Sequence, residues 1–366
     1  MESGKYIFLG FLILGFLILG CAQPTTVEKE KVDWAKNFET SLHYTRQGKI
    51  TFYSAEKGGM ELITNKPIKS FECIKCHAET KANGQKIETA SYVPDCYDCH
   101  VTPGDKVNET ICLGCHGRQR TEIAVLKLSD VHRDRGMKCI DCHSKEDVMG
   151  DGKHYATLLE RETAVRCENC HEFKTNPAHI LHGDRVHCST CHQSTVISCY
   201  NCHLDSAEEH QKRAFRPIAG FQVLVNFKGK VYPANYMTAV YNNKTFVAFQ
   251  PFYSHAIQKN AKDCSDCHGN ANVKAYLENG KIVMTRWNES SKSLSSIQGV
   301  VPLPPDWKTA MSFDYLTYIG DPSNPVKPEP WNWTYIKNSS DLMQIFFAEP
   351  MTREQIEKLA KEFKLK

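Results

Sequence analysis

Apolar residues are distributed unevenly along this chain. Residues 6–20 form one continuous apolar run behind a short segment that carries Lys5. Residues 71–210 contain few apolar runs long enough for a strand or an amphipathic helix. From residue 221 onward, apolar and polar positions alternate with the period of two that is typical of a strand. The pattern therefore separates a short leader, a long polar stretch and a C-terminal part with strand character.

The C-terminal part is expected to contain a small β-hairpin or meander. Three segments alternate in strand fashion: 221–227, 236–241 and 245–249. Asn242-Asn243-Lys244 is a turn sequence between the last two segments. A second turn at Asn279-Gly280 leads into residues 281–287.

The end of the chain predicts an extended segment followed by a helix. The extended segment is expected to wrap over the surface and contains Pro302, Pro304, Pro305, Trp307, Trp331 and Trp333. Thr352 and Gln355 have the spacing of a capping box. Four apolar residues fall on one face of the helix that would follow: Ile356, Leu359, Ala360 and Phe363. The sequence therefore predicts a short docking helix at the C-terminus.

The leader resembles a prokaryotic lipoprotein signal peptide. Its apolar run has about 15 residues, whereas a membrane span needs about 20. The run ends in Ile18-Leu19-Gly20-Cys21, which looks like a lipobox and implies cleavage before Cys21 and lipid attachment to its sulfur. An uncleaved hydrophobic anchor is the alternative. Either way, we expect an exported protein that is anchored to a membrane and faces the periplasm or the cell surface.

Cysteine and histidine are unusually abundant, with 17 Cys and 16 His in 366 residues. Eight times the chain reads Cys-x-x-Cys-His. The cysteines are Cys73, Cys76, Cys96, Cys99, Cys112, Cys115, Cys139, Cys142, Cys167, Cys170, Cys188, Cys191, Cys199, Cys202, Cys264 and Cys267. The histidines that follow them are His77, His100, His116, His143, His171, His192, His203 and His268. Only Cys21 lies outside the motifs.

This spacing predicts covalently attached haem. The two thiols add to the two vinyl groups of one porphyrin, and the histidine binds the iron as the proximal ligand. Zinc is the alternative, but structural zinc needs paired Cys-x-x-Cys units without an obligatory histidine after each one. The sequence therefore predicts eight covalently attached haem c groups.

The remaining histidines match the haems in number. They are His43, His132, His154, His179, His182, His187, His210 and His255. One distal histidine for each haem would give six-coordinate iron without an open position, which suits electron transfer. His43 could instead be a surface residue. One of His179, His182 and His187 could hydrogen-bond a propionate or line a substrate pocket.

These motifs set the expected organisation: a signal peptide over 1–20, a lipid-anchored tether over 21–40, a haem array with seven motifs over 41–220, and a C-terminal region over 221–366. The last region would hold the eighth motif, the hairpins and the terminal helix. The expected fold is mainly α and irregular, with a haem-packed core and a small β-containing C-terminal region. The six residues between His192 and Cys199 predict that the sixth and seventh haems are neighbours.

The haem number, the clustering and the intervening histidines over residues 43–268 resemble a multihaem cytochrome superfamily. It includes octahaem tetrathionate reductases, hydroxylamine oxidoreductases and pentahaem nitrite reductases. The resemblance implies a chain of bis-histidine haems that feeds one open or lysine-ligated haem. No motif here ends in lysine, and the chain is short for the octahaem enzymes. No catalytic residue is assigned, and Tyr97 and Tyr200 inside two motifs are expected to be packing residues.

We therefore expect an octahaem c-type cytochrome that transfers electrons outside the cytoplasmic membrane. Its expected partners are a membrane quinol oxidase module and a soluble or surface acceptor. Two alternatives stay open: a multihaem reductase or oxidoreductase of a small nitrogen or sulfur oxyanion, and a subunit of an extracellular conductive filament. The formal net charge of +3 omits the haem propionates, so the holoprotein is expected to be acidic. No basic cluster is interleaved with aromatics, which argues against a nucleic-acid partner.

Overall fold

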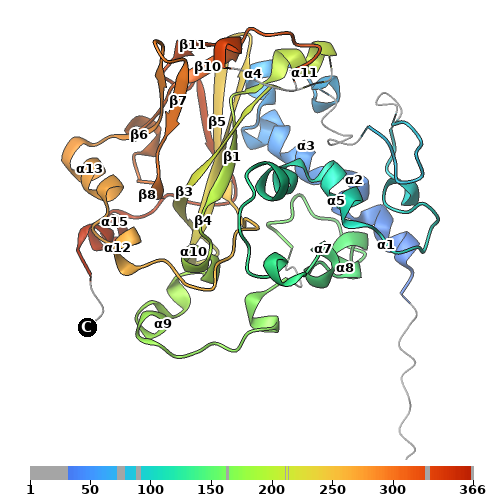
Figure 1. The fold of residues 1–366 in the computed structure, drawn as a ribbon, viewed down its shortest axis with the longest axis horizontal. Helices are drawn as coiled ribbons and strands as arrows, with labels where there is room; N and C mark the ends of the chain where they lie inside the picture. The colour runs from blue at the N-terminus through green and yellow to red at the C-terminus, as the bar shows by residue number, and fades with distance from the viewer. Residues whose placement is uncertain are drawn as a thin grey trace, which may run out of the picture. The chain divides into compact units, whose positions relative to one another are not determined.

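The computed structural model divides the chain into two units, Met1–Asp33 and Trp34–Lys366, and the second unit is described here by itself. The described residues are 32–71, 79–87, 92–161, 165–210, 212, 214–325 and 330–363 (Figure 1). The predicted signal peptide, Cys21 and the first motif at Cys73, Cys76 and His77 lie outside them. Within these ranges, no helix is both long and apolar enough to cross a membrane.

A seven-stranded sheet forms the centre of this unit. Its strands are β1 (Val196–Tyr200), β2 (Cys202–His203), β3 (Arg216–Phe227), β4 (Lys230–Tyr241), β5 (Lys244–Pro251), β8 (Gly299–Pro302) and β12 (Leu342–Ile345). The order is β1-β3-β4-β5-β12, while β2 pairs with β4 and β8 pairs with β3. β3, β4 and β5 are antiparallel neighbours. Asn242 and Asn243 have φ of 47° and 59° in the β4–β5 turn, which suits a two-residue hairpin loop.

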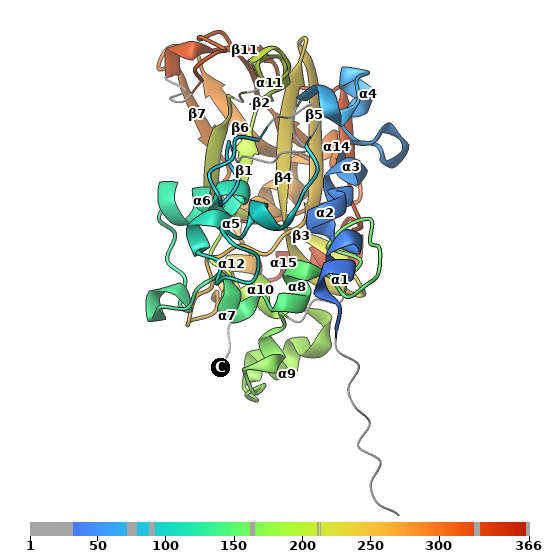
Figure 2. The same ribbon diagram turned by 90° about the vertical axis from the view of Figure 1, so that its right-hand side faces the viewer.

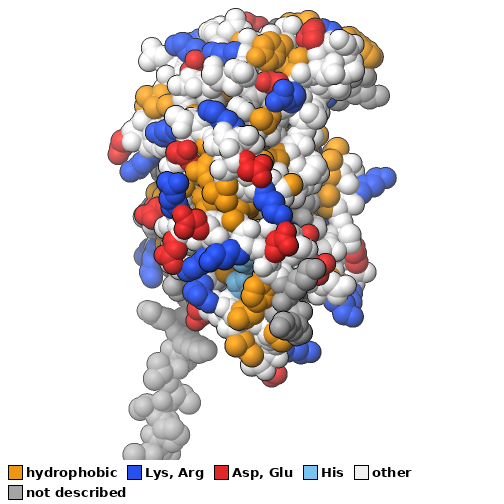
Figure 3. Space-filling view, turned by 90° about the vertical axis from the view of Figure 1, so that its left-hand side faces the viewer, with side chains coloured by type: hydrophobic (Ala, Val, Ile, Leu, Met, Phe, Trp, Pro, Cys, Tyr) orange, Lys and Arg blue, Asp and Glu red, His pale blue; other side chains and the backbone are white. Residues whose placement is uncertain are grey.

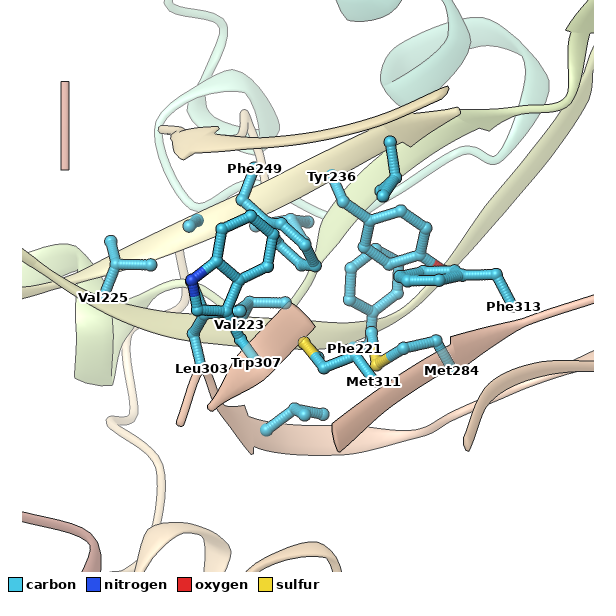
Figure 4. Close-up of a cluster of buried hydrophobic side chains, with 14 of the residues drawn as sticks. Phe221, Val223, Val225, Tyr236, Phe249, Met284, Leu303, Trp307, Met311 and Phe313 are labelled. Carbon is cyan, nitrogen blue, oxygen red and sulfur yellow. The ribbon is translucent and has the colours of Figure 1, made fainter. Parts of the chain in front are cut away.

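The main hydrophobic core lies on one face of this sheet. Smaller strands cover that face: β6 (Ile282–Asn288), β7 (Ser293–Ser296), β9 (Met311–Phe313), β10 (Tyr315–Tyr318) and β11 (Trp333–Lys337). Figure 4 shows Phe221 and Phe249 of the large sheet packed toward Met284 and Phe313 of the smaller strands. Trp307, on α14 (Trp307–Ala310), packs edge-on against Phe249 at 5.6 Å between ring centres.

The opposite face of β4 and β5 is also buried. It is covered by α3 (Gln47–Tyr53), α4 (Glu61–Thr64), η2 (Ile68–Phe71) and α11 (Leu204–His210). On β4, Tyr236 belongs to the main core and Tyr241 to this second cluster. Because both faces are covered, most positions along β4 and β5 are buried, and the simple alternation of a half-exposed strand is lost.

The motif helices α5 (Glu109–Cys115) and α7 (Cys139–Cys142) lie on that second side of the sheet, α10 (Cys188–His192) lies near the lower end of its strands, and α12 (Cys264–Cys267) lies on the other side (Figure 1 and Figure 2). Besides α3 and α4, the α-helices that precede strand β1 in the chain are α1 (Trp34–Thr40), α2 (Leu42–Thr45), α5 (Glu109–Cys115), α6 (Gly117–Arg120), α7 (Cys139–Cys142), α8 (Lys145–Met149), α9 (Pro177–His182) and α10 (Cys188–His192). Besides η2, the 3-10 helices in the described part of the chain are η1 (Ala55–Lys57), η5 (Cys96–Asp98), η7 (Arg133–Arg135), η8 (Cys167–Asn169), η9 (Gly183–Arg185) and, later in the chain, η10 (Pro330–Asn332). One π-helix, η6 (Thr121–Val125), follows α6.

The other face of the unit carries the last helices. They are α12 (Cys264–Cys267), α13 (Ala271–Asn279) and α15 (Arg353–Ala360). Figure 3 views the molecule from the side opposite to α5 and α7, and shows Lys, Arg, Asp and Glu interspersed around apolar side chains in the middle of the face. Both signs of charge are therefore mixed on this face.

The expectation of a mainly α and irregular fold is wrong. The structure is 35% helical and 25% strand, so neither type dominates, and it contains several sheets. The error arose because the strands were expected to form a small appendage. They instead carry the main core, and β1 and β2 extend that sheet back into the seventh motif.

Individual elements are confirmed more often than the fold class. The three predicted strands correspond to parts of β3, β4 and β5, and residues 281–287 correspond to β6. Helix α15 has the predicted capping box between Thr352 and Gln355, and it buries Ile356 and Leu359. The surface wrap is wrong for two tryptophans, because Trp307 and Trp333 are buried.

Candidate functional site: paired histidines

The described motifs occupy two kinds of structure. The second, third, fourth, fifth, sixth and eighth motifs begin in η5, α5, α7, η8, α10 and α12. The seventh runs from β1 into β2, where Cys202 and His203 pair with Ala239 and Val240 of β4. The following cysteines are free thiols: Cys96, Cys99, Cys112, Cys139, Cys142, Cys167, Cys170, Cys188, Cys191, Cys264 and Cys267.

Four motif histidines each lie against a histidine from elsewhere in the chain. The ring centres are 5.9 Å apart for His43 and His116, 5.9 Å for His132 and His171, 6.4 Å for His179 and His192, and 6.2 Å for His182 and His268. These pairs belong to the third, fifth, sixth and eighth motifs. The structure thus joins sequence-predicted proximal and distal histidines two by two.

These distances suit a metal ion held between two imidazoles. Metal–imidazole bonds are about 2.0–2.1 Å long, so the two bonded nitrogens of such a pair lie about 4 Å apart. Adding the distance from each nitrogen to its ring centre gives a separation of about 6 Å. The four observed separations fall close to this value; three pairs have tilted rings and the His43–His116 pair is T-shaped, so none is stacked.

The hydrogen bonds of these rings favour metal binding by the far nitrogen. Nδ1 donates to a backbone carbonyl in five of the paired rings: His43 to Val148 at 3.0 Å, His179 to Lys174 at 2.5 Å, His182 to Ala178 at 2.9 Å, His192 to Gln258 at 3.4 Å and His268 to Lys358 at 3.1 Å. A carbonyl can only accept, so Nδ1 carries a proton and Nε2 is the nitrogen left to bind a metal. Metal-ligating histidines usually have this arrangement.

We count His143 of the fourth motif and His255 of the loop after β5 as a fifth pair on their electrostatic interaction. Burial, together with repulsion from the positive charge of His255, lowers the pKa of His143. Both Nδ1 atoms face carboxylates, with His143 3.6 Å from Asp147 and His255 3.2 Å from Glu122.

Two segments each serve several pairs. Helix α9 carries both His179 and His182, and their i, i+3 spacing brings the sixth and eighth motifs to one helix. The loop after β5 supplies His255 to the fourth motif. It also bonds Asp130 through Ile257 N at 2.9 Å, and accepts from His192 Nδ1 through Gln258 O. The sheet therefore helps to position three of the five pairs.

Cysteine contacts give an order to the motifs. The side chains of Cys112 and Cys139 are hydrogen-bonded, as are those of Cys167 and Cys188. Electrostatic interactions also join Cys99 with Cys112, Cys142 with Cys170, and Cys191 with Cys264. Together, these interactions between described cysteines connect the motifs in the order second, third, fourth, fifth, sixth and eighth.

His203 and His187 differ from the paired histidines. Nδ1 of each ring accepts from a backbone N–H, that of Ser206 and of Ser189 respectively, both at 3.3 Å. The ring proton is then on Nε2, and His203 Nε2 lies 3.2 Å from Thr317 Oγ1. His187 stacks on Tyr232 at 4.3 Å between ring centres, and burial lowers the pKa of His187 to about 4.

Three predicted site residues have a different setting. His100 Nδ1 donates to Asp105 O at 2.8 Å, which is the ligand-type arrangement. His154 is exposed and lines a hollow of about 290 Å³ with Thr45, Gln47, Tyr155 and Ala156. His210 ends helix α11, and its side chain lies outside the described part of the structure.

Sequence reasoning missed the buried carboxylates behind the rings. Glu122 is remote in sequence from His255, whereas Asp130 and Asp147 lie close in sequence to His132 and His143, and no motif marks any of the three. Only a three-dimensional arrangement could reveal them.

The expectation of eight covalently attached haem c groups is corrected. Among the residues that the structure describes, no group of three or more His, Cys, Asp or Glu side chains could hold a metal ion. The chain brings together pairs of imidazoles, and a pair does not complete the coordination of a metal by itself. Within the same residues, no second imidazole is recorded beside His100 or His203, so the structure does not support a count of eight.

Comparisons with protein-family models, with curated proteins and with solved structures found no match to this chain.

Proposed function

We propose that this chain is an electron-transfer protein in which paired histidines bind haem iron from both sides. The observation that carries the proposal is the set of four histidine pairs at 5.9–6.4 Å between ring centres. We propose five haem positions, which are these four pairs and the His143–His255 pair, and not the predicted count of eight.

The residues present fit such a group. Each pair offers two imidazoles, and a Cys-x-x-Cys sequence directly precedes one member of each pair. Haem bound there would supply a one-electron couple. The histidines would occupy both axial positions and so keep substrates from the iron, which favours a carrier over an enzyme at these five positions.

Exposed apolar side chains in the motif region also support the proposal. Ile140 lies inside the fourth motif and is 54% exposed, and Ile180 lies between the two α9 histidines and is 70% exposed. Such side chains are stabilised when an apolar surface covers them. A porphyrin face beside each histidine pair is a surface of this kind.

The proposed route for electrons follows the cysteine contacts. It runs from the third motif through the fourth, fifth and sixth to the eighth, which are the five paired positions. Helix α9 holds the last step together, because His179 and His182 on one helix serve the sixth and eighth motifs.

The location and partners belong to the same proposal. The lipobox-like sequence at Cys21 supports an exported protein held at a membrane by a lipid. A protein in that place would exchange electrons with a membrane quinol oxidase module on one side and a soluble or surface acceptor on the other. Cys21→Ser is expected to release the protein from membranes, and fractionation would show this.

The stretch with three histidines provides a matched test. His179→Ala and His182→Ala each remove one member of a pair, whereas His187→Ala removes a ring that stacks on Tyr232. We expect each of the first two variants to convert one iron from low spin to high spin in the EPR spectrum. His187→Ala should leave the number of low-spin irons unchanged.

The comparison within this set decides the proposal. Unchanged low-spin signals in both His179→Ala and His182→Ala would show that these pairs do not bind iron. A new high-spin iron in His187→Ala would show that the ring contacts in the structure do not identify the ligands. Haem content measured on the same samples separates loss of a ligand from loss of the whole group.

A further inference from the structure

Glu122 has an unusual place behind one of the paired histidines. Its side chain is fully buried, with 0% exposure, and it lies in the π-helix η6. π-Helical turns are rare and occur often at functional sites. Glu122 Oε2 accepts from both the backbone N–H and Nδ1 of His255, each at 3.2 Å. The carboxylate therefore fixes the ring and directs Nε2 away from itself.

The charge of Glu122 has little compensation. Oε1 has no hydrogen-bond partner, and within the described residues the one ion pair recorded for Glu122 is with His255. Burying a carboxylate without a countercharge is costly. A fixed negative charge at this place therefore needs a positive charge on or beyond the imidazole of His255.

The other two carboxylates are compensated differently. Asp130, beside His132, accepts from three backbone N–H groups, those of His132, Arg133 and Ile257. Asp147, beside His143, lies 3.6 Å from Arg161 Nη1. The remaining paired rings with a recorded Nδ1 bond donate to neutral carbonyls. Glu122 is thus the carboxylate whose charge acts most directly through a histidine.

A carboxylate in this position would change the redox balance of the iron. Oxidised haem iron carries one more positive charge than reduced iron, so a nearby negative charge stabilises the oxidised form. The effect is strong in a buried place, because the local dielectric constant is low. A hydrogen bond from Nδ1 to a carboxylate also makes the ring a more basic ligand.

We propose that Glu122 is a positioning residue that gives the haem ligated by His255 the lowest reduction potential of the five paired positions. This inference rests on the proposed function. The haem held at the fourth motif, in the middle of the order of motifs, would then be reduced last and oxidised first. Electrons would pass through it only transiently on the way from the third motif to the fifth.

Glu122→Gln tests the charge separately from the geometry. The amide oxygen of glutamine can still accept from Nδ1 and from the backbone N–H of His255, while the negative charge is removed. In an EPR-monitored redox titration of the holoprotein, we expect all low-spin irons to remain. The lowest-potential component should move upward by about 59 mV, which corresponds to a tenfold change in the ratio of oxidised to reduced iron.

Asp341→Asn is the control, because Asp341 binds Lys337 and Thr245 beside β5 and contacts no paired histidine in the recorded bonds of the described residues. Its potentials should match those of the unaltered protein. An unmoved lowest potential in Glu122→Gln, with low-spin iron retained, would overturn the inference and leave the proposed function intact. Absence of low-spin bis-histidine iron in the unaltered protein would overturn the proposed function itself.

A second variant covers the case in which Glu122→Gln does not fold. His255→Ala should convert one iron to high spin, and the low-spin component that disappears should be the one with the lowest potential. Disappearance of a higher-potential component would contradict the inference.

Discussion

The sheet region and the motif region of this protein are stabilised in different ways. The strands from β1 to β12 surround a core that includes Phe221, Tyr236, Phe249 and Trp307, all almost fully buried. Between residues 92 and 192, by contrast, no described Val, Ile, Leu, Met, Phe, Tyr or Trp is buried. Apart from Pro94, the buried side chains there are polar and include Glu122 and Asp130.

This difference shows which region needs a bound group. The sheet region buries enough apolar surface to be stable from its own side chains. The motif region leaves Val101, Ile140, Phe173 and Ile180 exposed and brings histidines together in pairs. The predicted haem-packed core was wrong for the whole chain, but the proposed haems would supply what this one region lacks.

The largest expected effect is that of haem removal on the motif region. Protein produced without haem maturation should lose ordered structure over residues 92–192, because these residues have almost no apolar core. Limited proteolysis with mass spectrometry should then find cleavage concentrated there, with β3, β4 and β5 protected. Equal protection of both regions would break the comparison.

The second largest effect is expected from removing a large side chain from the sheet core, which should lower the free energy of unfolding. Phe249→Ala removes a fully buried ring that packs on Trp307 and Phe313, and is expected to lower the free energy of unfolding by about 3–5 kcal/mol. Haem content and spin state should not change. Trp331→Ala, at a tryptophan that is 66% exposed, is the control and should change stability little in thermal unfolding.

The two tyrosines inside motifs allow a direct comparison of packing in the motif region and the sheet region. Tyr200 in the seventh motif is fully buried, and its hydroxyl bonds Thr285 at 2.5 Å and Asp314 O at 2.9 Å. Tyr200→Phe should therefore lower the free energy of unfolding, measured by chemical denaturation, by about 1–2 kcal/mol. Tyr97 in the second motif is 41% exposed, so Tyr97→Phe should change stability by less than about 0.5 kcal/mol. Equal effects would contradict the difference in packing.

The smallest expected effect concerns an ion pair at the edge of the sheet region. Burial raises the pKa of Asp341, but hydrogen bonds from Lys337 and Thr245 outweigh it and hold the pKa below its ordinary value. A lowered pKa in the folded state stabilises the protein above the unfolded pKa of about 3.9, and this stability is lost as pH falls through the folded value.

Asp341→Asn should therefore lower stability at pH 7 by about 0.5 kcal/mol, because the side chain is 43% exposed and its charge is screened. The difference from the unaltered protein should shrink below pH 4. Urea unfolding at pH 7, 5 and 3 would measure it. If the difference in the free energy of unfolding grew as pH falls, the pKa of Asp341 would not be lowered in the folded protein.

Local patterns predicted parts of both regions well. The alternation over 245–249 and the capping box at Thr352 depend on neighbouring residues, and both appear in the structure as β5 and α15. The burial of Trp307 and Trp333 was missed because proline-rich surroundings suggested a surface segment. Their burial depends on strands far away in sequence, which no local pattern describes.

The candidate site was predictable in composition but not in arrangement. Every paired histidine was recognised as a ligand candidate: the motif histidines from the Cys-x-x-Cys-His spacing, and their partners because the remaining histidines match the motifs in number. The pairing of His43 with His116 spans 73 positions, and it depends on the fold that brings α2 to α5. Glu122 had no signal at all, because a buried carboxylate in a π-helix reads in the sequence like any surface glutamate.

The most direct test of the central claim is an EPR spectrum of the purified oxidised holoprotein, with haem counted on the same sample as the pyridine haemochrome. The account predicts at least five low-spin irons with bis-histidine signals for each chain. Fewer than five low-spin irons, or a chain purified from a haem-maturing host without haem, would contradict it.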